Sequence, residues 1–141
     1  MELPFSTEEL TRLYRFALLL TGEEGAAQQL VYDACVDCAA RLASYRNEHS
    51  RLACMLGTLR QKAKPATVAA EAPALVRDFA GLPEPERAAM AGLYTGILPA
   101  RELAEALKIS LEQLGRALKS AREQLGRNGL ALGEPSMEQA L

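Results

Sequence analysis

The chain of 141 residues contains no tryptophan, and phenylalanine and tyrosine bring its aromatic content to only 5%. The β-branched residues that favour strands are scarce, whereas alanine and leucine, which favour helices, dominate the composition. Because 49% of the residues are hydrophobic, the chain has enough apolar surface for a packed core. We therefore predict an all-α protein.

Long apolar runs are also missing. The longest run, residues 16–20, is far shorter than the roughly 20 residues that a membrane-spanning helix needs. The N-terminus lacks the basic start and apolar stretch of a secretory signal. The three cysteines, an odd number, do not have the spacing of a disulfide framework. We expect a reduced, cytoplasmic protein with no membrane partner.

Few side chains could bind a metal or support catalysis. His49 is the only histidine, and no serine or cysteine is clearly paired with it for nucleophilic catalysis. Cys35, Cys38, Cys54 and His49 could form a zinc site, but the first two lie on the apolar stripe of a predicted helix. Free cysteine is usually buried, which favours packing over zinc binding. With no glycine-rich phosphate loop either, we predict no enzyme, no metal, no cofactor and no small-molecule substrate.

Capping residues and apolar periodicity predict three helices in the first half of the chain. Ser6 and Glu9 form a capping box. Gly22 is suited to the left-handed conformation that ends a helix. Thr21 with Glu24 is placed to start the next helix. The predicted helices span residues 7–20, 23–44 and 50–63.

The second half is predicted to follow a linker over residues 65–80, which includes a possible short helix over 74–80. Pro83 lies in the first turn of the next helix, and Ser110 with Gln113 forms a second capping box. The last helix has an apolar stripe of Leu111, Leu114, Leu118, Ala121 and Leu125. We predict two helical domains, residues 1–64 and 81–127, and a flexible tail over 128–141.

Charge is distributed unevenly, although the net charge is only −2. Residues 46–64 contain five basic side chains and one acid, and residues 111–127 contain four basic side chains and two acids. These stretches could contact phosphate groups, or they could be the solvated faces of helices.

Residues 99–107, a tight turn at 108–109 and the helix from Ser110 have the size and order of a helix-turn-helix. Such a unit inserts its second helix into the major groove of DNA. Any helical hairpin of a small bundle would give a similar pattern. The polar side chains off the apolar stripe of the second helix include Glu112, Gln113, Arg116 and Lys119.

These C-terminal segments, together with residues 82–94, resemble the promoter-binding domain of bacterial sigma factors of the extracytoplasmic-function (ECF) type. Residues 13–27, 30–34 and 41–45 are similar to the N-terminal domain of the same family. The two matches follow the family's order and cover nearly the whole chain. The resemblance implies a three-helix domain like sigma region 2, followed by a helix-turn-helix domain like sigma region 4.

The resemblance also implies the partners of the chain, which would be core RNA polymerase, promoter DNA and an anti-sigma factor. Arg60 and Lys62 could contact DNA. Equally, they could interact favourably with the helix dipole, whose negative end lies at the C-terminus of their own helix. Tyr32 is either an exposed contact or a partly buried packing residue. The DNA-binding residues would be Glu112, Gln113, Arg116, Lys119, Arg122, Arg60 and Lys62, and the partner-binding residues Gln28, Gln29, Tyr32 and Asp33.

The chain departs from the family at functional positions. Gln28 and Gln29 stand where acidic residues are usual, and residues 50–59 lack the usual Phe and Trp. Gly115 stands near a position that is usually basic, and Lys108 replaces the glycine usual in the turn. Two alternatives to an active sigma factor therefore remain: a degenerate sigma mimic that binds an anti-sigma factor or another protein, and a dimeric helix-turn-helix repressor.

Overall fold

The computed structural model describes residues 5–64, 68 and 71–127. These residues form helices and no strand, which confirms the predicted all-α class, and none of the helices is long and apolar enough to cross a membrane. The tail predicted over 128–141 lies outside the described residues, as do residues 65–67 and 69–70 of the linker predicted over 65–80. The helices are α1 (Thr7–Thr21), α2 (Glu24–Leu42), α3 (Glu48–Lys62), α4 (Ala74–Ala80), α5 (Glu86–Thr95), α6 (Ala100–Leu107) and α7 (Leu111–Arg127).

Helix α1 begins and ends as predicted. The Ser6 hydroxyl accepts a hydrogen bond from the Glu9 amide at 3.1 Å, and the Glu9 carboxylate accepts one from the Ser6 amide at 2.8 Å. Gly22 ends the helix in the left-handed conformation, with φ of 86°. Both devices act within four residues, so the local sequence is sufficient to specify them.

The starts of α2 and α3 differ from the predictions. Glu23 caps α2, because its carboxylate accepts hydrogen bonds from two amides of the first turn at 2.8 and 2.6 Å. Thr21, predicted to start α2, is instead buried and donates its hydroxyl to the carbonyl of Ala17 at 2.9 Å. Asn47 caps α3 by accepting a hydrogen bond from the His49 amide at 2.7 Å, so α3 begins two residues earlier than predicted.

The short helix predicted over 74–80 is present as α4, and α5 begins later than predicted. Proline disfavours the helical conformation of the residue before it, so Pro85 keeps Glu84 out of α5 and the helix starts at Glu86.

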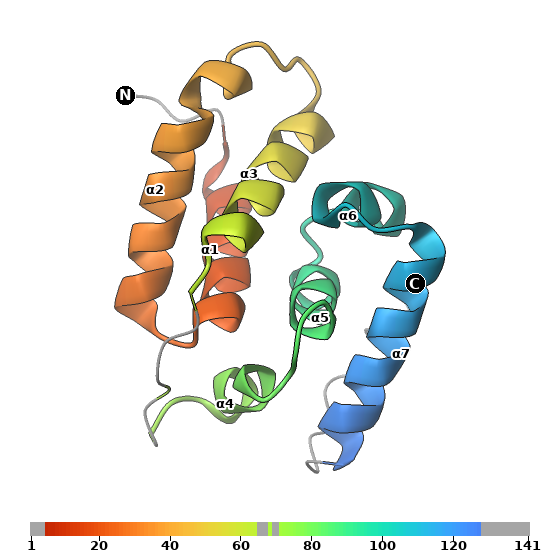
Figure 1. The fold of residues 1–141 in the computed structure, drawn as a ribbon. Coiled ribbons are helices and arrows are strands. Elements are labelled where there is room, and N and C mark those ends of the chain that lie inside the picture. Colours follow the sequence, from red (N-terminus) through yellow and green to blue (C-terminus); the bar gives the residue numbers. More distant parts are fainter. Residues whose placement is uncertain (1–4, 65–67, 69–70, 128–141) are drawn as a thin grey trace.

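Helix α1 lies at the centre of the molecule and packs against α2, α3, α4 and α5 (Figure 1). Helix α5 lies between α1 and α7, and α6 packs across α3. The described parts of the two predicted domains therefore contact each other along two seams, α1–α5 and α3–α6. Their buried side chains belong to one continuous core, which includes Phe16, Leu56, Met90, Leu107 and Leu125.

The α3–α6 seam is tight because Gly57 has no side chain. A Cβ atom at Gly57 would lie 3.1 Å from the carbonyl oxygen of Ala106. The absence of that atom lets the backbones of α3 and α6 approach closely.

Candidate functional site

Helices α6 and α7 form a hairpin whose turn is defined by Lys108. This lysine ends α6 in the left-handed conformation, with φ of 59° and ψ of 41°. Its amide donates to the carbonyl of Glu105 at 3.1 Å, and the Ile109 amide donates to the carbonyl of Ala104 at 3.0 Å. These two bonds are those of a Schellman motif. Lys108 stands where the resembled family usually has glycine, and the left-handed backbone at this position favours glycine.

The predicted capping box at the start of α7 is confirmed. The Ser110 hydroxyl accepts from the Gln113 amide at 3.0 Å, and the Gln113 side-chain oxygen accepts from the Ser110 amide at 2.8 Å. The Gln113 side chain is therefore already held against the helix end.

The apolar stripe of α7 faces the core, with one exception. Leu114, Leu118, Ala121 and Leu125 are buried as predicted. Leu111 is 53% exposed, so the prediction that it belongs to the buried stripe is wrong. A helical side chain leans toward the N-terminus of its helix, and Leu111 is the first helical residue, so its side chain projects beyond the packed part of α7.

Most of the predicted DNA-binding side chains share the outer side of α7. Glu112, Gln113, Arg116 and Lys119 are exposed, and Arg122 is half-buried and interacts with other groups. Arg116 lies 3.5 Å from the carboxylate of Glu112. Because an exposed ion pair of this kind is weak, it leaves the Arg116 guanidinium able to contact a phosphate.

Arg60 and Lys62 lie in the last turn of α3, not on α7. Arg60 is half-buried at the α3–α6 seam, where its Nη1 donates to the carbonyl of Leu107 at 2.8 Å and its Nε lies 3.6 Å from the carboxylate of Glu84. Lys62 is exposed and lies 4.0 Å from the carboxylate of Asp37. Each of these two cations therefore has an acidic neighbour from another segment, and Arg60 also satisfies the C-terminus of α6.

The predicted partner-binding residues lie on the outer side of α2. Gln28 is exposed, and Gln29 donates its side-chain amide to the carboxylate of Asp33 at 2.8 Å. Tyr32 is 65% exposed, so the alternative that it is a partly buried packing residue is wrong. Val36, one helical turn later, is 61% exposed. It was not among the predicted partner-binding residues, although its four-residue spacing from Tyr32 places the two on one face.

Arg87 is an important residue that nothing in the sequence marks. It is only 4% exposed, and its Nε donates to the carbonyl of Leu19 near the end of α1 at 2.8 Å. Burial lowers the pKa of Arg87, and the carboxylate of Glu84 acts against that effect. This buried, charged hydrogen bond joins α5 to α1.

The cysteines are free and lie near the contact of α2 with α3. Cys38 is buried and donates its thiol to the Thr58 hydroxyl at 3.1 Å, and Thr58 donates in turn to the carbonyl of Cys54 at 2.9 Å. Burial, followed by the hydrogen bond with Cys38, raises the pKa of Cys54 to about 11. Burial also raises the pKa of Cys35. Thiols with raised pKa values are poor nucleophiles at neutral pH.

In the part of the chain that the structure describes, no three histidine, cysteine or acidic side chains are placed to hold a metal ion. His49 is exposed at the start of α3, where its amide is used in the cap. Comparisons with protein-family models, with curated proteins and with solved structures find no match for this chain. The function is therefore inferred from the two exposed helix faces and the seams between the halves.

Proposed function

We propose that this chain is a sigma-factor-like protein that acts in transcription initiation or its regulation through core RNA polymerase and promoter DNA. In this proposal the predicted halves correspond to regions 2 and 4 of an ECF-type sigma factor. The observation that carries it is the hairpin of α6 and α7, in which a left-handed turn and a capping box present the polar side of α7 outward.

The outer side of α7 has the arrangement that a groove-binding helix requires. Its apolar side is buried, and Arg116 and Lys119 are exposed one helical turn apart. Basic side chains at this spacing can contact successive phosphates, whereas Gln113 near the helix start is at the end that approaches base edges. Glu112 and Glu123 are also exposed on α7, so we expect modest affinity.

The outer side of α2 is the surface that we assign to polymerase. Tyr32 and Val36 give it an exposed apolar centre, and Gln28, Gln29 and Asp33 give it polar neighbours. An apolar centre with a polar rim is the usual composition of a protein interface.

Two measurements test this function. The first is retention of the purified chain by core RNA polymerase, with Tyr32→Ala and Val36→Ala expected to weaken binding and the exposed substitution Arg15→Ala, on α1, as control. The second is run-off transcription from DNA selected out of a random duplex pool by the chain together with polymerase. Failure to bind polymerase combined with failure to select DNA would refute the proposal.

A second candidate function is a sigma mimic that binds another protein without starting transcription. The specific observation in its favour is Arg60, which is engaged with Leu107 and Glu84 instead of being presented to DNA. If the mimic is correct, α7 should show no salt-dependent DNA binding. If the sigma-like function is correct, contacts from the exposed Arg116 and Lys119 predict a slope of about −2 in the logarithmic plot of affinity against salt.

A further inference from the structure

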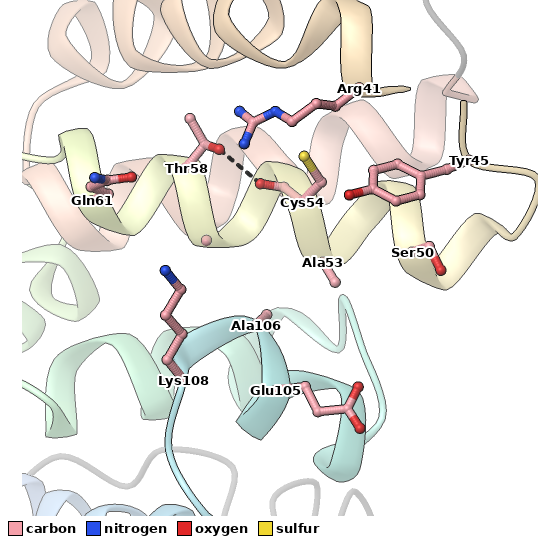
Figure 2. A pocket seen from close by; sticks show the side chains of 11 residues that line it. Arg41, Tyr45, Ser50, Ala53, Cys54, Thr58, Gln61, Glu105, Ala106 and Lys108 are labelled. Atoms are coloured by element: carbon pink, nitrogen blue, oxygen red, sulfur yellow. Dashed lines mark hydrogen bonds between the residues drawn. The ribbon is translucent and has the colours of Figure 1, made fainter. Parts of the chain in front are cut away.

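A pocket of ≈ 360 Å³ opens beside the α3–α6 seam. The end of α2, the exposed side of α3 and the end of α6 form its walls (Figure 2). Gly57, Gln61 and Lys108 also line a neighbouring pocket of ≈ 270 Å³, so the two pockets are parts of one groove along the seam.

The groove brings together cations from both halves of the chain. Arg41 extends from the end of α2 across α3, and Lys108 extends from the α6–α7 turn toward α3 (Figure 2). Among the residues that the structure describes, Glu105 is the only acid that lines the pocket. The neutral polar side chains around the cations are Tyr45, Ser50, Thr58 and Gln61. The lining therefore carries one net positive charge, and the carboxylate of Asp37 lies beside it, 3.5 Å from Arg41.

Arg41 has hydrogen-bond donors left for a ligand. Its Nη2 lies 3.6 Å from the Cys38 sulfur and 3.5 Å from the carboxylate of Asp37. Both contacts use the same nitrogen. Because a guanidinium has five N–H donors on three nitrogens, Nε and Nη1 can bind an anion while Nη2 keeps the side chain in place.

Lys108 occupies a backbone conformation that lysine disfavours, at φ of 59°. Glycine would adopt the left-handed conformation without strain, and asparagine with less strain than lysine. Strained residues are found where the side chain has a role that the surrounding structure supports. Figure 2 shows that this side chain enters the pocket, so its ammonium group is the candidate for that role.

We propose that this pocket binds a small phosphate-bearing ligand, held between Arg41 of α2 and Lys108 of the α6–α7 turn. A phosphate group has a charge of about −1.5 to −2 at neutral pH and oxygens in several directions, so it can accept hydrogen bonds from both walls at once. Because the walls belong to the two halves of the chain, the ligand ties α6 to α2 and α3. The proposal is independent of the sigma-like function, since it requires neither polymerase nor DNA.

The test is a titration of the full chain with inorganic phosphate and with pyrophosphate at constant ionic strength, followed by ³¹P line broadening and by the midpoint of thermal unfolding. We expect saturable broadening and a rise in the midpoint that saturates over the same millimolar range. Linear changes that a chloride titration reproduces would be screening and would overturn the proposal.

Three variants locate the site. Arg41→Gln is expected to weaken phosphate binding by about tenfold or more, because it removes a charged hydrogen-bond donor. Lys108→Gly is expected to raise the unfolding midpoint of the free chain, since it relieves the strained turn, and to abolish the rise caused by phosphate. Arg15→Gln removes an exposed cation of α1 and is expected to bind phosphate as the parent chain does. Unchanged binding by both Arg41→Gln and Lys108→Gly would place any phosphate elsewhere and refute the pocket.

Discussion

The Arg60 guanidinium donates a hydrogen bond of 2.8 Å to the carbonyl of Leu107 and so joins α3 to the last turn of α6. The last carbonyls of a helix have no partner within the helix. Arg60 therefore satisfies a backbone group that would otherwise need water or a capping side chain, and it does so from the other half of the chain.

Arg60→Met is expected to lower the free energy of unfolding by about 1–3 kcal/mol, because it keeps the aliphatic stem but leaves the Leu107 carbonyl without its charged donor. Chemical denaturation of the variant measures the change. Lys62→Met is the matched control: Lys62 is exposed and only 4.0 Å from its acidic neighbour, so its loss should cost less than about 0.5 kcal/mol. Equal effects of the two substitutions would contradict a structural role for Arg60.

Arg87→Ala is expected to destabilise the fold by about 3 kcal/mol or more, since it leaves a cavity and removes the donor to the buried Leu19 carbonyl. Arg87→Met fills more of the same space and should cost clearly less than Arg87→Ala. Hydrogen exchange should show the largest loss of protection in α1 and α5, which this residue joins. If the Arg87→Ala chain were as stable as the parent, the buried charge would make no net contribution to the free energy of unfolding.

Gly115→Ala is expected to stabilise the protein by about 1 kcal/mol, because glycine is the poorer helix former within α7. A Cβ atom at this position would meet nothing within 4 Å. Gly92→Ala is the opposing control, since a Cβ atom there would overlap the Leu103 side chain, and it should destabilise by about 1–3 kcal/mol. Thermal unfolding of both variants checks the prediction: the unfolding midpoint should rise for Gly115→Ala and fall for Gly92→Ala.

The Cys54 thiol should react slowly. Its pKa is raised from 9.0 to about 11, so at pH 8 its thiolate fraction is about 100-fold lower than that of a thiol with the ordinary value. Alkylation followed by mass spectrometry of the Cys54 peptide should show this retardation in the folded chain and not in the urea-unfolded chain.

The raised pKa of Cys54 also predicts how the free energy of unfolding changes with pH. A thiol whose pKa is raised by folding contributes stability below about pH 9, and that contribution is lost as the pH rises toward 11. The stability difference between the parent chain and Cys54→Ala should therefore change over this range in the direction that disfavours the parent. A constant difference from pH 8 to pH 11 would contradict the raised pKa.

The local sequence specified much of the secondary structure. The capping boxes at Ser6 and Ser110 and the left-handed end of α1 at Gly22 were predictable, because each depends on residues within four positions of one another. The buried stripe of α7 was predictable except for Leu111, since helical periodicity gives the face but not the packing at a helix end.

The candidate site likewise has features that the sequence predicted and features that it could not. The polar side of α7 followed from helical spacing, whereas the sequence left the exposure of Tyr32 open. The role of Arg60 could not be predicted, because a cation at the end of a helix has the same local sequence whether it faces solvent, DNA or another helix. Its partner Leu107 lies 47 residues away, and Leu19 lies 68 residues from Arg87.

The sequence by itself determined the all-α class and the helix-ending signals, through interactions between residues on the same turn. Only the tertiary structure decided that α6 packs on α3, that α5 packs on α1 and that Arg41 and Lys108 line one pocket. The physical reason is that burial of apolar faces is non-directional: periodicity shows which side of each helix must be covered, but the partner helix is selected by packing complementarity such as that between Gly57 and Ala106.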